Sequence, residues 1–284
     1  MFDYAALDAL ATVIETGSFE AASARLGVSQ SAVSQRIRQL EERMGAVLVI
    51  RSTPCRATED GARLIAHLRE VALLETELAP SETPPVLRVA VNADSLATWV
   101  LPALAEIEGV RFDLVIDDQD HSAGLLRRGE VAGAITADEG PIAGCDSVSL
   151  GRLRYIATAS PDFVARYFPD RIDRHSLRAA PALQFNAKDR LQDRWASMIA
   201  GMPMGLRAHR IGSTEGFVEA CLRGMGWGLN PEALVRAHLE SGALERLGPA
   251  PIDVPLYWQS ARRLKAPLAP LTKALRQAAK AVLL

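Results

Sequence analysis

The stretch at residues 29–45, SQSAVSQRIRQLEERMG, predicts a helix whose two faces carry different chemistry. One face repeats apolar side chains every three or four positions, which is the spacing of a helix that packs on a core. These side chains are Val33, Ile37, Leu40 and Met44. The opposite face carries serines, glutamines and an arginine, whereas a merely solvated face favours lysine and glutamate. Such side chains hydrogen-bond to the base edges of DNA in the major groove, which admits one α-helix.

Positive charge gathers around this helix, although the chain as a whole has a net charge of −2. Residues 25–56 contain six arginines and two acids, and acids upstream leave the first 56 residues neutral but polarised. Arginine grips phosphate, and the free N–H groups at a helix start suit a phosphate oxygen. We expect eight residues to contact DNA: Ser29, Gln30, Ser31, Ser34, Gln35, Arg38, Arg51 and Arg56. An ordinary surface helix is the alternative, which leaves the arginine patch unexplained.

A second stretch, RVAVNADSLATWVLPAL at residues 88–104, predicts a ligand site. A strand ends near Val91 and a helix begins near Ser95, so the loop between them lies at the carboxyl end of the strand, where open α/β sheets bind ligands. The first N–H groups of that helix suit a carboxylate. Acids follow the other two strands on this edge: Asp117, Asp118, Asp120, Asp138 and Glu139. This arrangement favours a zwitterion with an additional positive charge, such as lysine or arginine.

Ten residues are candidates for binding this ligand: Asn92, Asp94, Ser95, Trp99, Asp118, Thr136, Asp138, Ser213, Thr214 and Glu215. The last three begin another helix in the second half of the domain and would complete the site from the opposite side. A purely structural interpretation stays open, in which Asp94 is a helix cap, residues 117–120 form a solvated turn and Trp99 belongs to the core.

The sequence offers little for catalysis or metal binding. Three widely spaced cysteines form no CxxC pair, the five histidines have no metal-ligand spacing, and no Ser-His-Asp elbow or phosphate loop is present. The glycines of GMGWG at 224–228 lack the GxGxxG order and favour a helix-ending turn. We therefore expect no enzyme, no cofactor and no metal, while an enzyme on a two-lobe α/β fold stays open as an alternative.

Glycines and capping residues divide the N-terminal 57 residues into short helices. One helix ends at Gly17, a second starts after Ser18 and ends at Gly27, and the tight GVS connection leads to the third. Two helices joined in this way indicate a helix-turn-helix, and residues 52–56 predict a two-stranded wing. We expect residues 1–57 to form a winged helix-turn-helix domain.

Thr58 begins a longer helix with apolar side chains every three or four residues up to Pro80, a rod of roughly 30 Å. A long helix with one apolar stripe needs a partner, and we expect a second copy of itself in a dimer. Packing on the C-terminal domain is the alternative. PSETPP at residues 80–85 ends the rod, so residues 58–85 are the linker.

From residue 86 the pattern alternates between strands and helices, which predicts an α/β domain with parallel strands at residues 86–284. We expect two lobes with a cleft between them: lobe I at about 86–160 plus 260–284, and lobe II at about 161–259. The final helix is expected to return to lobe I. With 49% apolar and 23% charged residues, no transmembrane run and no secretory signal, the chain is expected in the cytoplasm and off the membrane.

The stretch FEAASARLGVSQSAVSQRIRQLEERMGAVLVIR followed by ATEDGARL resembles the winged helix-turn-helix of LysR-type transcriptional regulators. The matching positions are Ala21, Ala22, Leu26, Ser29, Gln30, Ser34, Ile37, Leu40, Glu41, Gly45, Leu48 and Arg51. Val49–Ile50 stands where the family usually has phenylalanine, which is a conservative change. The resemblance implies a DNA-binding domain, a linker helix and a two-lobe effector domain similar to periplasmic solute-binding proteins of type 2.

AVNADSLATW, together with YFPD, is similar to the lysine- and arginine-responsive subgroup of these regulators. The resemblance implies a regulator that senses L-lysine or L-arginine and activates a gene for export of basic amino acids. It also implies homodimers or homotetramers on double-stranded DNA, with RNA polymerase as a further partner. A regulator with a different small-molecule effector is the alternative, and a solute-binding receptor is a third reading that leaves residues 1–57 without a role.

Overall fold

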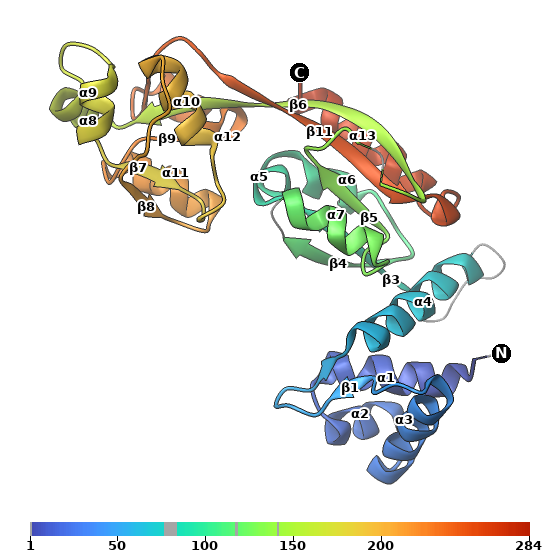
Figure 1. Ribbon diagram of the computed structural model, residues 1–284. Helices are drawn as coiled ribbons and strands as arrows, with labels where there is room; N and C mark the ends of the chain where they lie inside the picture. Colours follow the sequence, from blue (N-terminus) through green and yellow to red (C-terminus); the bar gives the residue numbers. More distant parts are fainter. Residues whose placement is uncertain (1, 77–83, 117–118, 141) are drawn as a thin grey trace.

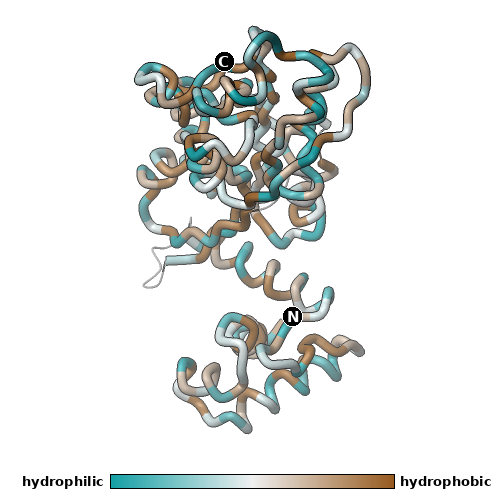
Figure 2. Tube along the Cα trace, turned by 90° about the vertical axis from the view of Figure 1, so that its left-hand side faces the viewer, coloured by the Kyte–Doolittle hydropathy of each residue, from teal (hydrophilic) through white to brown (hydrophobic). Residues whose placement is uncertain are grey.

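The computed structural model describes residues 2–76, 84–116, 119–140 and 142–284. A small helical domain at the N-terminus is joined through one helix to a larger C-terminal domain (Figure 1). The view turned by 90° shows the two domains as separate bodies that meet at this helix (Figure 2). The predicted fold class, a winged helical domain followed by an α/β domain, is confirmed.

Three short helices form the N-terminal domain. They are α1 at Tyr4–Thr16, α2 at Phe19–Leu26 and α3 at Gln30–Met44. Each begins at a side chain that accepts a backbone N–H bond, namely Asp3, Ser18 or Ser29. Each ends at a glycine with positive φ, where a side chain would be strained: Gly17, Gly27 or Gly45. The local sequence therefore sets all six helix ends.

The apolar side of α3 packs on α1 and α2. Val33, Ile37 and Leu40 are buried in the core of this domain. Met44 is 38% exposed, so the predicted apolar stripe ends one turn earlier than expected. The Glu41 carboxylate accepts an N–H bond from Leu48 at 2.8 Å, which fixes the start of the wing relative to α3.

The wing consists of two short antiparallel strands, β1 at Val49–Ile50 and β2 at Arg56–Ala57. The Cys55 N–H donates to the Gly17 carbonyl at 2.7 Å, and a Cβ on Gly17 would lie 2.9 Å from Pro54 Cβ. This close approach holds the wing against the turn between α1 and α2.

The helix α4, at Glu59–Glu75, begins at Thr58 as predicted. Its first half packs in the N-terminal core through Leu64 and Ile65, while Leu73 is buried in the core of the C-terminal domain. Packing on the C-terminal domain, the less favoured alternative, therefore holds for this end of the helix. Leu74 is 39% exposed, so pairing with a second copy stays a prediction. Leu78, Pro80 and most of the segment 80–85 at the end of the linker lie outside the described residues.

One seven-stranded sheet extends through the C-terminal domain, in the order β10-β6-β11-β5-β3-β4 with β9 beside β6. The strands are β3 at Val86–Val91, β4 at Arg111–Ile116, β5 at Gly133–Thr136, β6 at Cys145–Ala159, β9 at Gly228–Pro231, β10 at Glu245–Arg246 and β11 at Ile252–Ala261. The strands β3, β4 and β5 are parallel as predicted, whereas β6 and β11 are antiparallel, so the sheet is mixed.

The long strands β6 and β11 connect the two lobes (Figure 1). The first half of β6 and the second half of β11 belong to lobe I, since β11 pairs with β5 from Tyr257 onward. The second half of β6 pairs with β9 and β10 in lobe II. The sequence analysis did not predict β6, whose polar and apolar residues do not alternate cleanly along its length.

Helices cover the sheet of lobe I. They are α5 at Ala93–Ser95, a π-helical turn at Leu96–Val100, α6 at Leu101–Ala105, α7 at Gln119–Arg127, the 3-10 turn η2 at Arg262–Leu264 and α13 at Ala269–Val282. Pro102 has no N–H and its ring crowds the carbonyl four residues back, which accounts for the wider turn. The helix α13 packs on α6 and β6, so the predicted return of the final helix to lobe I is confirmed.

Lobe II places short parallel strands beside five helices. The elements are α8 at Pro161–Tyr167, α9 at Arg174–Ala179, β7 at Ala182–Gln184, α10 at Leu191–Ala200, β8 at Ala208–Arg210, α11 at Thr214–Leu222 and α12 at Glu232–Glu240. Trp195 and Trp227 stack at 5.1 Å between ring centroids in the core of this lobe. Among the described helices, none is long and apolar enough to span a bilayer.

Candidate functional site

The outer face of α3 and the wing carry the residues predicted to contact DNA. Ser29, Gln30, Ser31, Gln35, Arg38, Arg51 and Arg56 are exposed, and Ser34 is half-buried. The Ser29 hydroxyl accepts the Ala32 N–H at 3.2 Å and lies 2.9 Å from the Ser31 hydroxyl, so both serines also organise the start of the helix. Seven of these eight side chains are therefore exposed, on α3 and its start and on the wing.

The arginines of this region differ in what holds them. The Arg51 guanidinium lies 5.0 Å from the centre of the Phe19 ring, which holds it beside the start of α2. Arg25 instead forms an ion pair with Glu15 at 3.1 Å, within the domain. Arg38 stands exposed on the outer face of α3. Arg25 serves the fold, while Arg38 and Arg51 are placed for an external partner.

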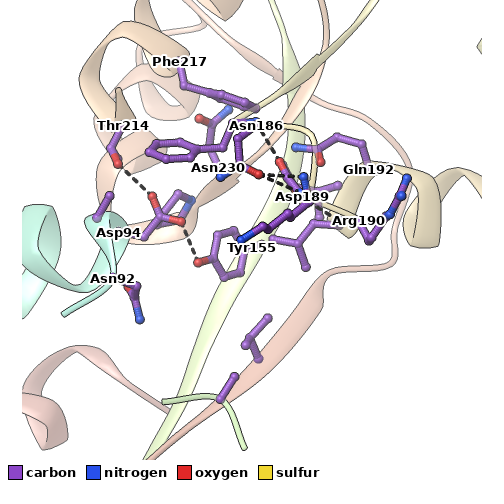
Figure 3. A pocket seen from close by; sticks show the side chains of 18 of the residues that line it. Asn92, Asp94, Tyr155, Asn186, Asp189, Arg190, Gln192, Thr214, Phe217 and Asn230 are labelled. Atoms are coloured by element: carbon purple, nitrogen blue, oxygen red, sulfur yellow. Dashed lines mark hydrogen bonds between the residues drawn. The ribbon is translucent and has the colours of Figure 1, made fainter. Parts of the chain in front are cut away.

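A cavity of about 650 Å³ lies between the lobes of the C-terminal domain. This is the size of a site for a small metabolite. Its polar lining includes Asn92 and Asp94 from lobe I, Tyr155 from β6, and Asp189 and Thr214 from lobe II (Figure 3). Three of the ten predicted ligand residues, Asn92, Asp94 and Thr214, thus line the cavity.

The Asp94 carboxylate joins the two lobes. Its Oδ2 accepts a hydrogen bond from the Tyr155 hydroxyl at 2.7 Å, and its Oδ1 accepts one from the Thr214 hydroxyl at 3.0 Å (Figure 3). Burial raises the pKa of Asp94 above its ordinary value, and the two hydrogen bonds oppose this shift. Burial and the nearby Asp94 charge raise the pKa of Tyr155 well above its ordinary value. The hydroxyl therefore stays protonated and donates.

Asp189 supplies a second carboxylate from the lobe II side. Its Oδ2 accepts the Phe185 N–H at 2.9 Å and its Oδ1 accepts the Leu191 N–H at 3.0 Å. Burial raises the pKa of Asp189, while these backbone bonds lower it. The sequence analysis missed Asp189 and the loop FNAKDR at 185–190. The loop follows β7, so the rule that selected the loop after β3 would have found it.

The predicted carboxylate site at the start of the helix after β3 is different in the structure. The Asn92 side chain caps this helix, and its Oδ1 accepts the Ser95 N–H at 2.7 Å. Ser95 is fully buried and does not line the cavity. Its N–H is thus used by the cap, and its hydroxyl faces the protein interior.

The other candidates in lobe I that the structure describes do not line the cavity. Trp99 is 1% exposed and belongs to the core, as its purely structural interpretation predicts. The buried Thr136 hydroxyl accepts a bond from the Gln259 amide at 3.1 Å. Asp138 is exposed and accepts the Gly140 N–H in a turn. Asp118 and the neighbouring Asp117 lie outside the described residues, as does the side chain of Asp120.

Two of the three candidates at the start of α11 also lie outside the cavity. Ser213 caps the helix by accepting the Gly216 N–H at 3.1 Å, and Glu215 is exposed. Thr214 between them is buried and points toward Asp94 (Figure 3). The helix start therefore contributes one hydroxyl to the cavity.

Basic and aromatic side chains complete the lining. Lys188, Arg190 and Arg194 line the cavity from exposed positions, whereas the two carboxylates lie deeper. Phe185 and Phe217 supply apolar wall. The predicted acidic cleft is thus a mixed one, with carboxylates inside and cations at the rim. Among the described residues, no cluster of three metal-binding side chains occurs.

Family models match both domains. A model of the LysR substrate binding domain matches residues 81–284, and a model of the bacterial regulatory helix-turn-helix protein of the lysR family matches residues 4–62. The HTH-type transcriptional regulator ArgP from Pseudomonas fluorescens is 46% identical over 269 residues, covering 91% of this chain and 90% of the relative. The lysine export transcriptional regulatory protein LysG from Corynebacterium glutamicum is 43% identical over 284 residues, covering 96% of each.

Solved structures agree with this relationship over the full length. The crystal structure of ArgP from Mycobacterium tuberculosis aligns with a TM-score of 0.81 at 40% identity, covering 100% of this chain and 99% of that one. Full-length LysG from Corynebacterium glutamicum with bound effector Arg aligns with a TM-score of 0.68 at 40% identity, covering 99% of both chains.

Proposed function

The chain belongs to the LysR family of bacterial transcriptional regulators, and we propose that it senses a basic amino acid, L-arginine or L-lysine, in the cavity between its lobes. As a member of this family it is a DNA-binding regulator and not an enzyme. The regulated gene, on this proposal, encodes an exporter of basic amino acids that the regulator activates. The relative named for lysine export supports that assignment.

The observation that carries the effector assignment is the pair of partly buried carboxylates, Asp94 and Asp189. Their described partners are hydroxyl, backbone and amide groups. An ionised carboxylate taken out of water is costly, which agrees with the raised pKa of each group. A ligand cation would restore the lost stabilisation. Arginine and lysine each bring two positive groups and one carboxylate, and LysG is known with bound arginine.

The ligand orientation follows from the distribution of charge. The ammonium and side-chain cations would bind Asp94 and Asp189, with Tyr155 and Thr214 completing the polar contacts. The α-carboxylate would face the basic rim at Lys188, Arg190 and Arg194. The methylene chain would pack on Phe217. Asn92 and Ser213 would support the site indirectly, because they cap the helices that carry Asp94 and Thr214.

DNA recognition is assigned to the exposed surface of α3 and the wing. Gln30, Gln35 and Arg38 would read base edges, since their side chains match adenine and guanine in the major groove. Ser29 and the wing arginines Arg51 and Arg56 would contact phosphates. Ser31 and Ser34 lie between these groups on the same face.

The working division of the chain follows from these assignments. Residues 1–57 bind DNA, 58–85 form the linker and 86–284 bind the effector. Two copies would pair through α4, and contacts between effector domains would give tetramers that bend DNA and contact RNA polymerase. A regulator of this kind acts where the DNA is, which places it in the cytoplasm.

The melting temperature of the purified chain with each of the twenty amino acids at millimolar concentration tests the effector assignment. A ligand at a hundred times its Kd stabilises the native state by about 2.7 kcal/mol, which is a shift of a few degrees. Arginine or lysine should give that shift. A shift with another amino acid instead, or with none, would contradict the effector assignment and leave the family membership unchanged.

A further inference from the structure

The linker helix α4 is held on lobe I by a bidentate ion pair between Glu70 and Arg263. Arg263 Nε donates to Glu70 Oε2 at 2.7 Å, and Arg263 Nη2 donates to Glu70 Oε1. The hydrogen bond to Glu70 raises the pKa of Arg263 above its already high ordinary value. A bidentate pair of this kind fixes direction as well as distance, since the planar guanidinium matches the carboxylate.

Apolar contacts surround this pair. Leu73, one turn further along α4, is 3% exposed and shares a core with Leu87 and Leu264 of lobe I. Gly129 has φ of +71°, and a Cβ there would lie 3.4 Å from Arg263 Nη2. A void of about 10 Å³ remains between helix and lobe. Leu73 therefore anchors the apolar side of this contact, and the ion pair adds a directional contact beside it.

The elements that hold α4 are the same ones that line the ligand cavity. Arg263 lies in η2, directly after β11, whose other end contributes Val254 and Pro255 to the cavity wall. A ten-residue strand spans roughly 33 Å, so one continuous strand connects both places, with an irregularity in its pairing between Leu256 and Tyr257. The strand β3 also connects the two places, because Val86 lies beside α4 and Asn92, just beyond the other end of the strand, lines the cavity.

We propose that the Glu70–Arg263 pair is the contact through which occupancy of the cavity sets the orientation of the DNA-binding domain. This inference rests on the proposed function. A ligand that changes lobe closure moves the ends of β6 and β11 relative to each other, and η2 carries that change to α4. The effect on DNA affinity requires that the ligand bind the two orientations unequally.

Exposure supports a switching role for this contact. The Arg263 side chain is 58% exposed and the Glu70 side chain 15%, so water reaches the pair from one side. When the pair opens, water can hydrate the Arg263 guanidinium, so opening costs less than it would for a fully buried pair. The buried Leu73 keeps α4 attached when the ion pair opens.

Charge reversal in the full-length chain tests this proposal. The variants are Glu70→Arg, Arg263→Glu and the double swap, with Arg262→Glu as the matched control. Arg262 is in the same turn, but its described partners, Asp146 at 2.9 Å and the Cys145 carbonyl at 3.2 Å, lie within lobe I. Two quantities are measured: the Kd for L-arginine by calorimetry, and DNA affinity with and without L-arginine, on a fragment selected from random DNA by the wild-type chain.

We expect both single reversals to keep the L-arginine Kd within about twofold of wild type and to lose most of the arginine-dependent change in DNA affinity. The double swap should recover that change, and Arg262→Glu should retain it. Reciprocity gives a second readout, since DNA must change the L-arginine Kd by the same factor. A full response in both single reversals, or no recovery in the double swap, would overturn the proposal. Absence of arginine binding to the wild type would instead overturn the proposed function.

Discussion

The N-terminal domain and the cleft of the C-terminal domain differ in how far apart in the sequence their hydrogen-bonded residues lie. In α2 and α3 each N-cap side chain accepts a bond from the residue three positions further on, as Ser29 does from Ala32. In the cleft, Asp94 is bonded to Tyr155 and Thr214, which are 61 and 120 positions away. On the proposed function, DNA binding therefore depends on locally determined helices, whereas ligand binding depends on how the two lobes are placed relative to each other.

The two regions also differ in how water reaches their charges. The arginines of the DNA-binding surface are exposed, so their contribution should fall steeply with added salt. The carboxylates of the cleft are buried, where salt screens less. On the proposed function, DNA binding releases counterions from the exposed surface, whereas ligand binding in the cleft replaces hydrogen bonds within the protein.

The largest effect is expected from Asp94→Asn. The change removes one partner of a buried charge pair with the ligand, which typically costs about 2–5 kcal/mol, or at least roughly thirtyfold in Kd for L-arginine. Calorimetry measures this loss. The unliganded variant should melt no lower than wild type, because a costly buried charge has been removed. A variant that binds arginine normally would remove Asp94 from the site.

Arg38→Ala should weaken DNA binding by about 1–3 kcal/mol, roughly tenfold, on a fragment selected by the wild-type chain. Arg25→Ala is the matched control, since its guanidinium is held by Glu15 within the domain. Fluorescence anisotropy at two salt concentrations distinguishes base reading from phosphate contact by the salt slope. Equal losses in both variants would contradict the assignment of α3 as the reading helix.

The contrast in scale explains what the sequence could predict. Helix ends in the N-terminal domain follow from Ser18, Gly27 and Ser29, which act on their neighbours in the chain. The loop holding Asp94 was predicted because it follows an apolar strand. Membership of a shared cavity is a different matter, since it depends on the relative position of the lobes.

Failures at the site have the same cause. Ser95 has a hydroxyl and neighbours Asp94, yet its N–H is bonded to the Asn92 cap and its side chain is buried. Asp189 follows β7 and satisfies the same strand-end rule, yet that rule alone does not show that β7 ends opposite β3. Thr136 was chosen on the same strand-end rule and is instead bonded to Gln259, 123 positions away.

Thr214→Val tests the contact between the lobes. The change keeps the shape of the side chain and removes a hydrogen bond to the Asp94 carboxylate of about 1.5 kcal/mol, so the L-arginine Kd should rise roughly tenfold. Ser213→Ala, which removes a helix cap outside the cavity, should lower the melting temperature with a smaller change in Kd. The reverse ranking of the two Kd values would contradict the role of Thr214.

The smallest effect concerns pH. Burial raises the pKa of Asp94, so protonation begins to compete with a cationic ligand as pH falls toward that value. The L-arginine Kd should rise as pH falls toward the raised pKa of Asp94, and Asp94→Asn should abolish this dependence. In the unliganded chain the sign is opposite: the contribution of Asp94 to stability is greatest below its ordinary value of 3.8 and is lost as pH rises through the raised pKa.

Selection of a doubly cationic amino acid by buried carboxylates is the central claim, and calorimetry with L-arginine and L-citrulline tests it most directly. Citrulline matches arginine in shape but carries a neutral urea in place of the guanidinium. The account predicts that the full-length chain binds arginine at least roughly thirtyfold more tightly, because one buried carboxylate would face a neutral group. Equal affinity for the two ligands would show that the carboxylates do not discriminate by ligand charge, and would contradict selection of a doubly cationic amino acid.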